Sequence, residues 1–217
     1  MINEVKILDR NISFFLDQLF FWSKNNFRKY PWRETNNPYD ILIAEILLQK
    51  TKSDKVFSVF SEFIHKYNNF QKIVIDDDQN IEKILKPLGL YRKKTRYLKK
   101  LSTEILNKYD GKIPLFVNEL KKILIIGDYT ANAFLCFSEG KKVILMDINI
   151  KRVIGRFFNL KSNYEDTLEE IIENVLDQDI KLFYWTLLDL GGLICVKKPL
   201  CYKCPLKLKC QFIVNSN

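Results

Sequence analysis

Apolar side chains recur every three or four residues along most of the chain, which is the spacing of an amphipathic α-helix. The first such stripe is formed by Ile12, Phe15, Leu16, Leu19 and Phe20. The same spacing predicts helices over residues 39–49, 53–67, 81–85, 91–109, 128–139, 148–158, 167–176 and 180–194, with another opened by Pro114. Only residues 143–146 have the pattern of an extended segment. We therefore expect an all-α protein of about ten helices.

The segment 39–49 is apolar on most sides, which predicts a helix at the centre of the core. Residues 30–37 precede it as a loop, and Asn37 and Pro38 suit its N-cap and first position. One acidic residue, Glu45, interrupts the apolar run. If it is buried, its pKa is raised and it can be protonated near neutral pH. The alternative is that Glu45 lies on a narrow strip of the helix that faces solvent.

The charge of the chain favours an anionic partner. Its 217 residues carry a formal net charge of +9, and 47% of them are hydrophobic, enough for one large or two small globular domains. No apolar run is long enough for a membrane span, and the N-terminus lacks a signal-peptide pattern, so we expect an intracellular protein. A basic surface can simply be solvated, but lysine and arginine cluster in residues 92–100 and 197–209, which favours nucleic acid.

Four of the five cysteines lie close together in the sequence. Cys136 fits the apolar stripe of a helix and is most simply a core residue. Cys195, Cys201, Cys204 and Cys210 are spaced C-x5-C-x2-C-x5-C. An odd count without an export signal argues against disulfides. Four such thiolates suit zinc or a [4Fe–4S] cluster, and the presence of only one C-x2-C pair favours the cluster.

Two positions between residues 124 and 149 have both a structural and a functional interpretation. Gly127 permits a tight turn before the next helix, whose first N–H groups suit a phosphate. Two helices joined in this way form a helix-hairpin-helix, which binds the DNA backbone without reading sequence. Asp147 precedes another helix, where it is either a simple N-cap or a carboxylate placed where positive charge develops in a reaction.

Together these features resemble the helix-hairpin-helix DNA glycosylase superfamily, in particular the endonuclease III-like group with a C-terminal iron–sulfur loop. The resemblance covers residues 27–211. It is carried by PWRETNNPYDILIAEILLQKT, GLYRKK, IIGDYTANAFLCFSEGKKVILMDINIKRVIGRFF and DLGGLIC, followed by the cysteine loop. It implies two helical lobes. Residues 29–140 form a six-helix lobe that ends in the hairpin, and residues 1–28 with 141–217 form a second lobe that carries the iron–sulfur loop at 195–210.

The resemblance implies three catalytic positions. Asp147 matches the family's essential aspartate, which stabilises the oxocarbenium-like sugar as the glycosidic bond breaks. Glu45 matches the glutamate with which adenine glycosylases protonate the departing purine. Thymine–guanine mismatch glycosylases also look like PWR…PY.ILI.EILL…T. Tyr129 stands where members that also cleave the strand carry lysine, and because tyrosine cannot form a Schiff base, we expect a monofunctional enzyme.

The resemblance also implies DNA contacts and a cofactor. Gln49 or Lys50 on one loop, with Leu90 or Tyr91 on another, match the wedge residues that fill the gap left by the flipped base. The hairpin matches the element that binds the DNA backbone. The expected DNA contacts are Gln49, Lys50, Leu90, Tyr91, Gly127 and Thr130. The four clustered cysteines match the ligands of a [4Fe–4S] cluster in a loop that binds DNA.

The hairpin departs from the family pattern Leu-Pro-Gly-Val-Gly. Ile125 replaces the first glycine, and Asp128 brings negative charge toward the expected phosphate. The neighbouring cations that could compensate are Lys121, Lys122, Lys141 and Lys142. In the family, carbonyl groups of this hairpin often hold a monovalent cation, and the altered residues weaken the expectation of such a cation here.

We expect a monofunctional DNA glycosylase that acts as a monomer on mismatched double-stranded DNA in the cytoplasm, at the nucleoid if the source is prokaryotic. Thymine or uracil opposite guanine is favoured, because a pyrimidine can leave as an anion whereas adenine needs protonation. Adenine glycosylases also usually add a C-terminal domain, and none fits between the cysteine loop and Asn217. Removal of adenine opposite guanine or 8-oxoguanine is the alternative supported by Glu45 and DLGGLIC. A non-catalytic DNA-binding iron–sulfur protein is the alternative of another class.

Overall fold

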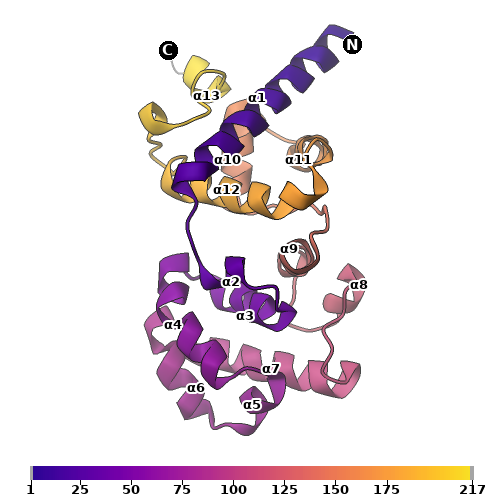
Figure 1. Cartoon of the computed structure of the whole chain (residues 1–217), viewed down its shortest axis with the longest axis vertical. Helices are drawn as coiled ribbons and strands as arrows, with labels where there is room; N and C mark the ends of the chain where they lie inside the picture. Colours follow the sequence, from indigo (N-terminus) through magenta and orange to yellow (C-terminus); the bar gives the residue numbers. More distant parts are fainter. Residues whose placement is uncertain (1, 216–217) are drawn as a thin grey trace. The chain divides into compact units, whose positions relative to one another are not determined.

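The computed structural model describes residues 2–215, with residues 2–10 described by their backbone alone. Within that part, the chain forms thirteen α-helices and no β-strand (Figure 1). The all-α class is confirmed, with more short helices than the sequence pattern predicts. The contacts divide the chain into two compact units, Lys29–Glu139 and Met1–Arg28 with Gly140–Asn217. None of the described helices combines the length and apolarity that crossing a membrane requires.

The unit of residues 29–139 is built around α3. Its helices are α2 Pro31–Glu34, α3 Pro38–Leu48, α4 Ser53–Lys66, α5 Phe70–Ile75, α6 Asp78–Leu85, α7 Tyr91–Tyr109, α8 Val117–Leu120 and α9 Asp128–Glu139. α3 packs against α2, α4, α7 and α9, and most of its side chains are buried. The expected central helix is therefore confirmed. Asn37 caps it by accepting a hydrogen bond from the backbone N–H of Tyr39 (3.0 Å).

α7 supplies the long amphipathic helix of this unit. Its inner face, with Leu98, Leu101 and Ile105 fully buried, packs against α5 and α6 (Figure 1). Lysine and arginine side chains occupy much of the opposite face. The helix ends in left-handed backbone at Asp110 and Gly111, and glycine takes such angles without a steric penalty.

The unit of residues 1–28 and 140–217 is built on α10 and α12. Its helices are α1 Ile2–Asn26, α10 Ile148–Phe158, α11 Tyr164–Glu173, α12 Ile180–Leu193 and α13 Gln211–Val214. α12 packs against α1 and α10, and α10 also packs against α11 and α13. Aromatic rings fill the contact between α1 and α10, where the centroids of Phe15 and Phe157 lie 5.0 Å apart. These rings bury apolar surface and hold α1 in this unit.

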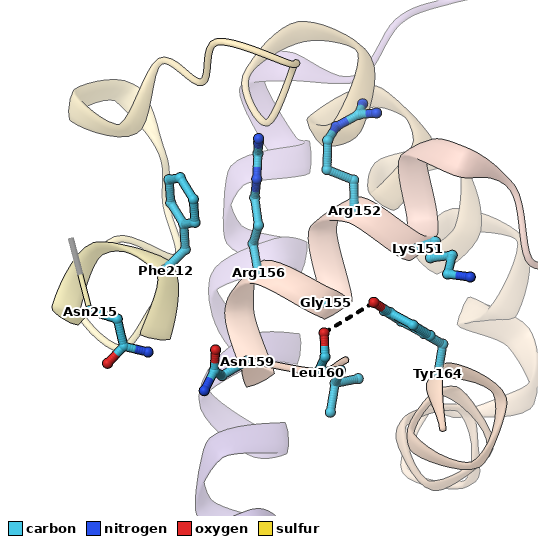
Figure 2. Close-up of a pocket in the computed structure, with 9 residues that line it drawn as sticks. All are labelled: Lys151, Arg152, Gly155, Arg156, Asn159, Leu160, Tyr164, Phe212 and Asn215. Carbon is cyan, nitrogen blue, oxygen red and sulfur yellow. Dashed lines mark hydrogen bonds between the residues drawn. The ribbon is translucent and has the colours of Figure 1, made fainter. Parts of the chain in front are cut away.

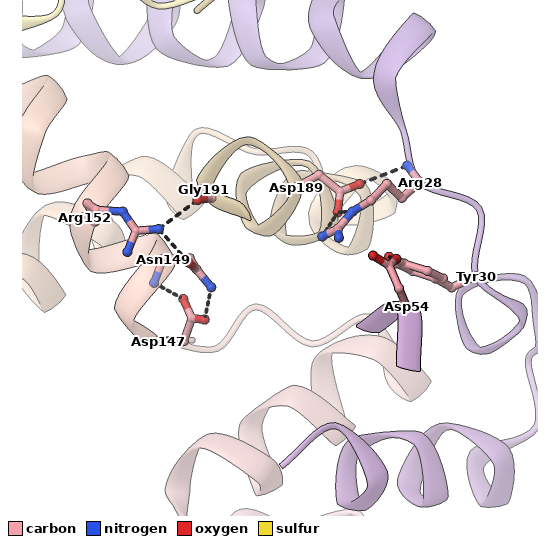
Figure 3. Close-up of polar contacts among 8 residues, drawn as sticks. All are labelled: Arg28, Tyr30, Asp54, Asp147, Asn149, Arg152, Asp189 and Gly191. Carbon is pink, nitrogen blue, oxygen red and sulfur yellow. Dashed lines mark hydrogen bonds and ion pairs between the residues drawn. The ribbon is translucent and has the colours of Figure 1, made fainter. Parts of the chain in front are cut away.

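A buried carboxylate fastens the end of the N-terminal segment to α12. Asp189 is fully buried, and its oxygens accept from the backbone N–H of Arg28 (3.0 Å) and from its Nε (2.7 Å). Nη2 of Arg28 adds an ion pair at 2.7 Å (Figure 3). A buried charge is tolerated only when it is paired and hydrogen-bonded, and this carboxylate is both.

Several segments differ from the pattern-based expectation, which did not include α5 or α13 and placed α11 three residues later. The expected loop over residues 30–37 contains α2, which is too short to show a helical period. Pro114 does not open a helix, because α8 begins only at Val117 and is followed by turns. Residues 143–146 are extended but have no strand partner; the hydroxyl of Tyr184 satisfies two of their backbone groups instead.

Candidate active site

Asp147 is the N-cap of α10. Its Oδ1 accepts hydrogen bonds from the backbone N–H groups of Asn149 (2.8 Å) and Ile150 (2.7 Å). Its Oδ2 accepts from Nδ2 of Asn149 at 2.9 Å (Figure 3). Three donors therefore fix the orientation of the carboxylate, and the helix N-terminus favours its negative charge.

A chain of hydrogen bonds continues from Asp147 to the cysteine loop. Nη2 of Arg152 donates to Oδ1 of Asn149 (2.6 Å), the same residue whose amide holds Asp147. Nη2 also donates to the carbonyl of Gly191 (2.7 Å), and Nε donates to the carbonyl of Cys195 (2.5 Å). Asp147 and the first loop cysteine are thus connected through two side chains.

Gly191 is a glycine because Asn149 lies against it. A Cβ built on Gly191 would lie 2.8 Å from the Cβ of Asn149 and 3.2 Å from its carbonyl oxygen. Real Cβ atoms do not approach so closely, so any side chain at 191 must displace Asn149. Gly192 differs, because its Cβ would meet only Nη2 of Arg28, at an ordinary 3.5 Å.

Glu45 is buried within α3, with 7% of its surface exposed. Burial disfavours the ionised carboxylate and raises its pKa to about 7, although the positive charge of Arg33 opposes the shift. The expectation of a buried carboxylate is confirmed, and the solvent-facing alternative is wrong. Glu45 can therefore exchange a proton near neutral pH.

The turn before α9 does not use unusual backbone angles at Gly127. The described glycines with positive φ are Gly89, Gly111 and Gly140, so the conformational argument for Gly127 is wrong. A Cβ at Gly127 would meet nothing within 4 Å. The glycine therefore leaves open space beside the start of α9.

The hairpin carries both an ion pair and an exposed apolar side chain. Lys121 forms an ion pair with Asp128, so the negative charge at the start of α9 has a cationic partner. Leu124 is 74% exposed. Of the other lysines considered, Lys122 pairs with Glu119 and Lys142 pairs with Asp177.

One expected DNA contact, Gln49, reaches the hairpin. Its Nε2 donates to Oγ1 of Thr130 (3.3 Å) and to the carbonyl of Ile125 (3.4 Å), one of the hairpin carbonyls. Thr130 is buried and Tyr129 is half-buried. The loop after α3 and the hairpin are therefore joined within this unit.

None of the four loop cysteines forms a disulfide. Burial, with the nearby thiols of the other three cysteines, raises the pKa of Cys204 to about 11. Within residues 2–215, no three His, Cys, Asp or Glu side chains are gathered closely enough to hold a single metal ion. Arg156 holds the loop, because it donates to the carbonyls of Val196 (2.7 Å) and Lys197 (3.1 Å) and lies 3.4 Å from Sγ of Cys195.

A pocket of about 420 Å³ lies beside this loop, between α10, α11 and α13 (Figure 2). It is lined by Lys151, Arg152, Gly155, Arg156, Asn159, Leu160, Tyr164, Phe212 and Asn215. None of the expected catalytic residues is among them. Two of its three cations hold the cysteine loop, and the third, Lys151, lies 4.5 Å from the ring centroid of Tyr164.

The expected site residues fall into both units. Asp147 and the cysteines belong to one, and Glu45, Tyr129, the wedge positions and the hairpin belong to the other. Sequence reasoning missed Asn149, Arg152 and Gly191. The only signal for them was the paired glycine in DLGGLIC, because polar residues on an amphipathic helix give no sign of their long-range partners.

Comparison with known proteins identifies the family. Residues 43–178 match the model of the HhH-GPD superfamily base excision DNA repair protein. The chain belongs to this superfamily.

Individual relatives cover most of the chain. It is 34% identical to the thymine/uracil-DNA glycosylase of Methanothermobacter thermautotrophicus over 89% of this chain and 90% of the relative. It is 31% identical to the adenine DNA glycosylase of Buchnera aphidicola subsp. Baizongia pistaciae over 93% of this chain and 59% of the relative. The solved structure of a thermostable thymine-DNA glycosylase matches with a TM-score of 0.87 and 30% identity, over 95% of this chain and 98% of that one.

The raised pKa of Glu45 predicts a pH-dependent stability. Between its usual value of 4.5 and about 7, the folded protein binds more protons than the unfolded chain, so stability falls as pH rises through this window. Relative to Glu45→Gln, the wild-type free energy of unfolding should fall by about 3 kcal/mol from pH 4 to pH 8. Chemical denaturation across this range measures it. Glu62→Gln, at an exposed position on α4, is the control, and parallel wild-type and Glu45→Gln curves would contradict the assignment.

The close approach at Gly191 predicts unequal effects at two adjacent glycines. Gly191→Ala should destabilise the fold by about 1–3 kcal/mol, because the methyl group displaces Asn149. Gly192→Ala should be neutral or slightly stabilising, since alanine favours helix and has room there. Thermal unfolding of the two variants compares them directly. Equal stability of both variants is the result that disproves the steric constraint.

Proposed function

We propose that the protein is a monofunctional DNA glycosylase that hydrolyses the N-glycosidic bond of thymine or uracil opposite guanine in double-stranded DNA. The chemistry needs a group that stabilises positive charge on the deoxyribose, a group that handles water, and an element that takes the base out of the duplex. Residues of this chain are available for each role.

The hydrogen-bonded carboxylate of Asp147 carries the proposal. As the bond to the base lengthens, the sugar becomes an oxocarbenium-like cation, and a nearby fixed carboxylate stabilises that charge without reorganising. The three donors that hold Asp147 keep it in one orientation. Asp147 also stands at the position of the essential aspartate in the family that this chain resembles.

We assign to Glu45 the activation of the attacking water. With a pKa of about 7, a fraction of the molecules at neutral pH has the ionised form that orients and deprotonates water. A pyrimidine leaves as an N1 anion and needs no proton from the enzyme. The attack of water on C1′ then completes hydrolysis, and the proton released passes to Glu45.

Tyr129 supports hydrolysis without strand cleavage. Formation of a Schiff base with the sugar requires an amine, and the phenol of Tyr129 cannot form one. The product is then an intact strand with an abasic site.

The relatives guide the choice of base. Both the thymine/uracil-DNA glycosylase and the solved thymine-DNA glycosylase match this chain over nearly their full lengths. Removal of adenine is the second candidate, because the protonated form of Glu45 available near pH 7 suits donation to a departing purine. The chain spans only 59% of that adenine-specific relative.

The DNA contacts follow from the loops of residues 29–139. We assign the wedge to Gln49 or Lys50 with Leu90 or Tyr91. We assign the backbone contact to the N-terminus of α9, where Gly127 leaves space and Thr130 contacts Gln49. Because Lys121 pairs with Asp128, the charge at this helix end is partly neutralised, which reduces repulsion of a phosphate.

The cysteine loop suits a [4Fe–4S] cluster. Cys195, Cys201, Cys204 and Cys210 form no disulfide and lie close enough to affect one another electrostatically, and Arg156 places a cation beside Cys195. We propose that these four residues ligate the cluster, which would cross-link the loop and present its lysines to DNA. Zinc, the alternative for a four-cysteine donor set, needs the thiolates around a single ion, and no three metal-ligating side chains within residues 2–215 are gathered that closely.

The variant Asp147→Asn removes the negative charge of this side chain and keeps an N-cap for α10. Asparagine is as good an N-cap as aspartate, so stability and DNA affinity should change little. Excision of thymine from a T:G duplex should fall by at least about 10²-fold in single turnover, since the negative charge is lost. Asp177→Asn, at an exposed residue paired with Lys142, is the control. If Asp147→Asn retains wild-type activity, the central assignment is wrong.

A panel of labelled duplexes tests the substrate and the reaction type. With T:G, U:G, A:G, A:8-oxoG and fully matched DNA, the wild type should produce alkali-labile sites in T:G and U:G. Cleavage only at adenine would establish the second candidate. Strand breaks without alkali would contradict the monofunctional assignment. If no duplex gives a product, the enzymatic proposal fails and the non-catalytic DNA-binding alternative is favoured.

A further inference from the structure

Lys94 differs from the other lysines of the basic helix α7. It is 3% exposed, whereas Lys93 and Lys100 on the same helix are exposed. Its Nζ donates to the carbonyls of Leu47 (2.8 Å) and Gln49 (2.9 Å). Burial lowers the pKa of Lys94 to about 8. A buried ammonium is costly unless its hydrogen bonds are satisfied, so these two carbonyls account for its position.

The two bonds fix the loop that follows α3. The last carbonyls of a helix have no partner within the helix, and cations are favoured there. Lys94 supplies that partner and holds the carbonyl of Gln49, one residue beyond the helix end. The next residue, Lys50, has left-handed backbone (φ 55), which is uncommon for lysine. The bonds of Lys94 therefore fix the backbone that enters this strained turn, and the backbone N–H of Thr51 closes the turn by donating to the carbonyl of Leu48 (3.0 Å).

The same residue bonds to the second wedge segment. The backbone N–H of Lys94 makes the first i→i−4 bond of α7, to the carbonyl of the N-cap Leu90 at 2.9 Å, so Lys94 belongs to the helix turn that Leu90 begins. Leu90 also has left-handed backbone (φ 51), and its side chain is 56% exposed. An exposed apolar side chain on a strained loop suits insertion between DNA bases.

The hairpin joins this arrangement through Gln49. While its carbonyl accepts from Lys94, its side-chain amide donates toward Thr130 and Ile125. Lys94 is thus bonded to both wedge segments directly and to the hairpin through one intervening residue. All of these residues lie in the unit of residues 29–139.

We propose that Lys94 is a positioning residue for base flipping, whose ammonium holds the loop at 47–50 to the first turn of α7, where the loop at 90–91 begins, so that both loops enter the duplex at a fixed separation. The proposal rests on the function proposed above, because it takes these loops to be the DNA wedge. Lys94 contacts neither base nor phosphate in this role. It acts through Gln49 and Leu90.

Lys94→Met tests the proposal, because methionine keeps the length and apolar stem but donates no hydrogen bond. Flipping is followed by the fluorescence of 2-aminopurine beside the mismatched base, and excision is followed in single turnover. The equilibrium constant for flipping and the rate constant for excision should each fall by about 10²-fold, because a misplacement of about 1 Å can cost that much. The Kd for an undamaged duplex should not change. Lys94→Arg, which can donate to both carbonyls, should restore part of the flipping.

Two control variants separate positioning from stability. Lys108→Met removes an exposed lysine of α7 that pairs with Glu104, and it should flip like the wild type. Leu101→Ala opens a cavity in the buried face of α7 and destabilises the fold without touching the wedge loops. At a temperature where every variant is folded, Leu101→Ala should also flip normally. Equal loss of flipping in Leu101→Ala and Lys94→Met, or wild-type flipping in Lys94→Met, overturns the proposal.

Amide hydrogen exchange provides a readout that does not depend on catalysis. The N–H of Thr51 bonds to the carbonyl of Leu48 across the strained turn, and its exchange should accelerate in Lys94→Met but not in Lys108→Met. If the wild type excises no base, the proposed function fails, while exchange still reports whether Lys94 holds the turn. Unchanged exchange in Lys94→Met refutes the positioning role, whatever the enzyme excises.

Discussion

The ends of two helices impose the constraint on which the candidate site depends. The first amides and last carbonyls of a helix cannot be satisfied within it, and when they are removed from water they require other partners. At the start of α10 that partner is the carboxylate of Asp147, and at the end of α3 it is the ammonium of Lys94. In both places the group that satisfies the helix end also has a proposed role: Asp147 stabilises the cationic sugar, and Lys94 positions the wedge loops.

This constraint spreads through each unit by hydrogen bonds. From Asp147 the bonds pass through Asn149 and Arg152 to the carbonyls of Gly191 and Cys195, so the carboxylate and the cysteine loop share their supports. Asp147, Asn149 and Arg152 are half-buried, and each is held by more than one of these hydrogen bonds. The cramped site at Gly191 belongs to the same arrangement, because a side chain there would displace Asn149.

The altered hairpin is explained partly by its neighbours. Loss of the family's first glycine places Ile125 in the turn, and its carbonyl accepts from Gln49. The acidic residue at the start of α9 pairs with Lys121. Local sequence alone made Asp128 look unfavourable for binding an anion, whereas the ion pair lowers its effective charge. Neither backbone angles nor crowding by neighbouring atoms requires a glycine at position 127.

Much of the local structure followed from the sequence. The bounds of α7, α9 and α10 and the cap at Asn37 were predictable, because helical period and capping depend on residues within one or two turns. The sequence left the burial of Glu45 open, and the packing around α3 decided it. The short helices α2 and α8 were not, since four residues cannot show a period. Lys94 was hidden among the cations of a basic helix, and its partner Leu47 lies 47 residues away. Tertiary packing alone decided which lysine turns inward, which glycine has no room for a side chain and which arginine holds the cysteine loop. These contacts join residues that lie far apart in the sequence, and such separations carry no periodic signal.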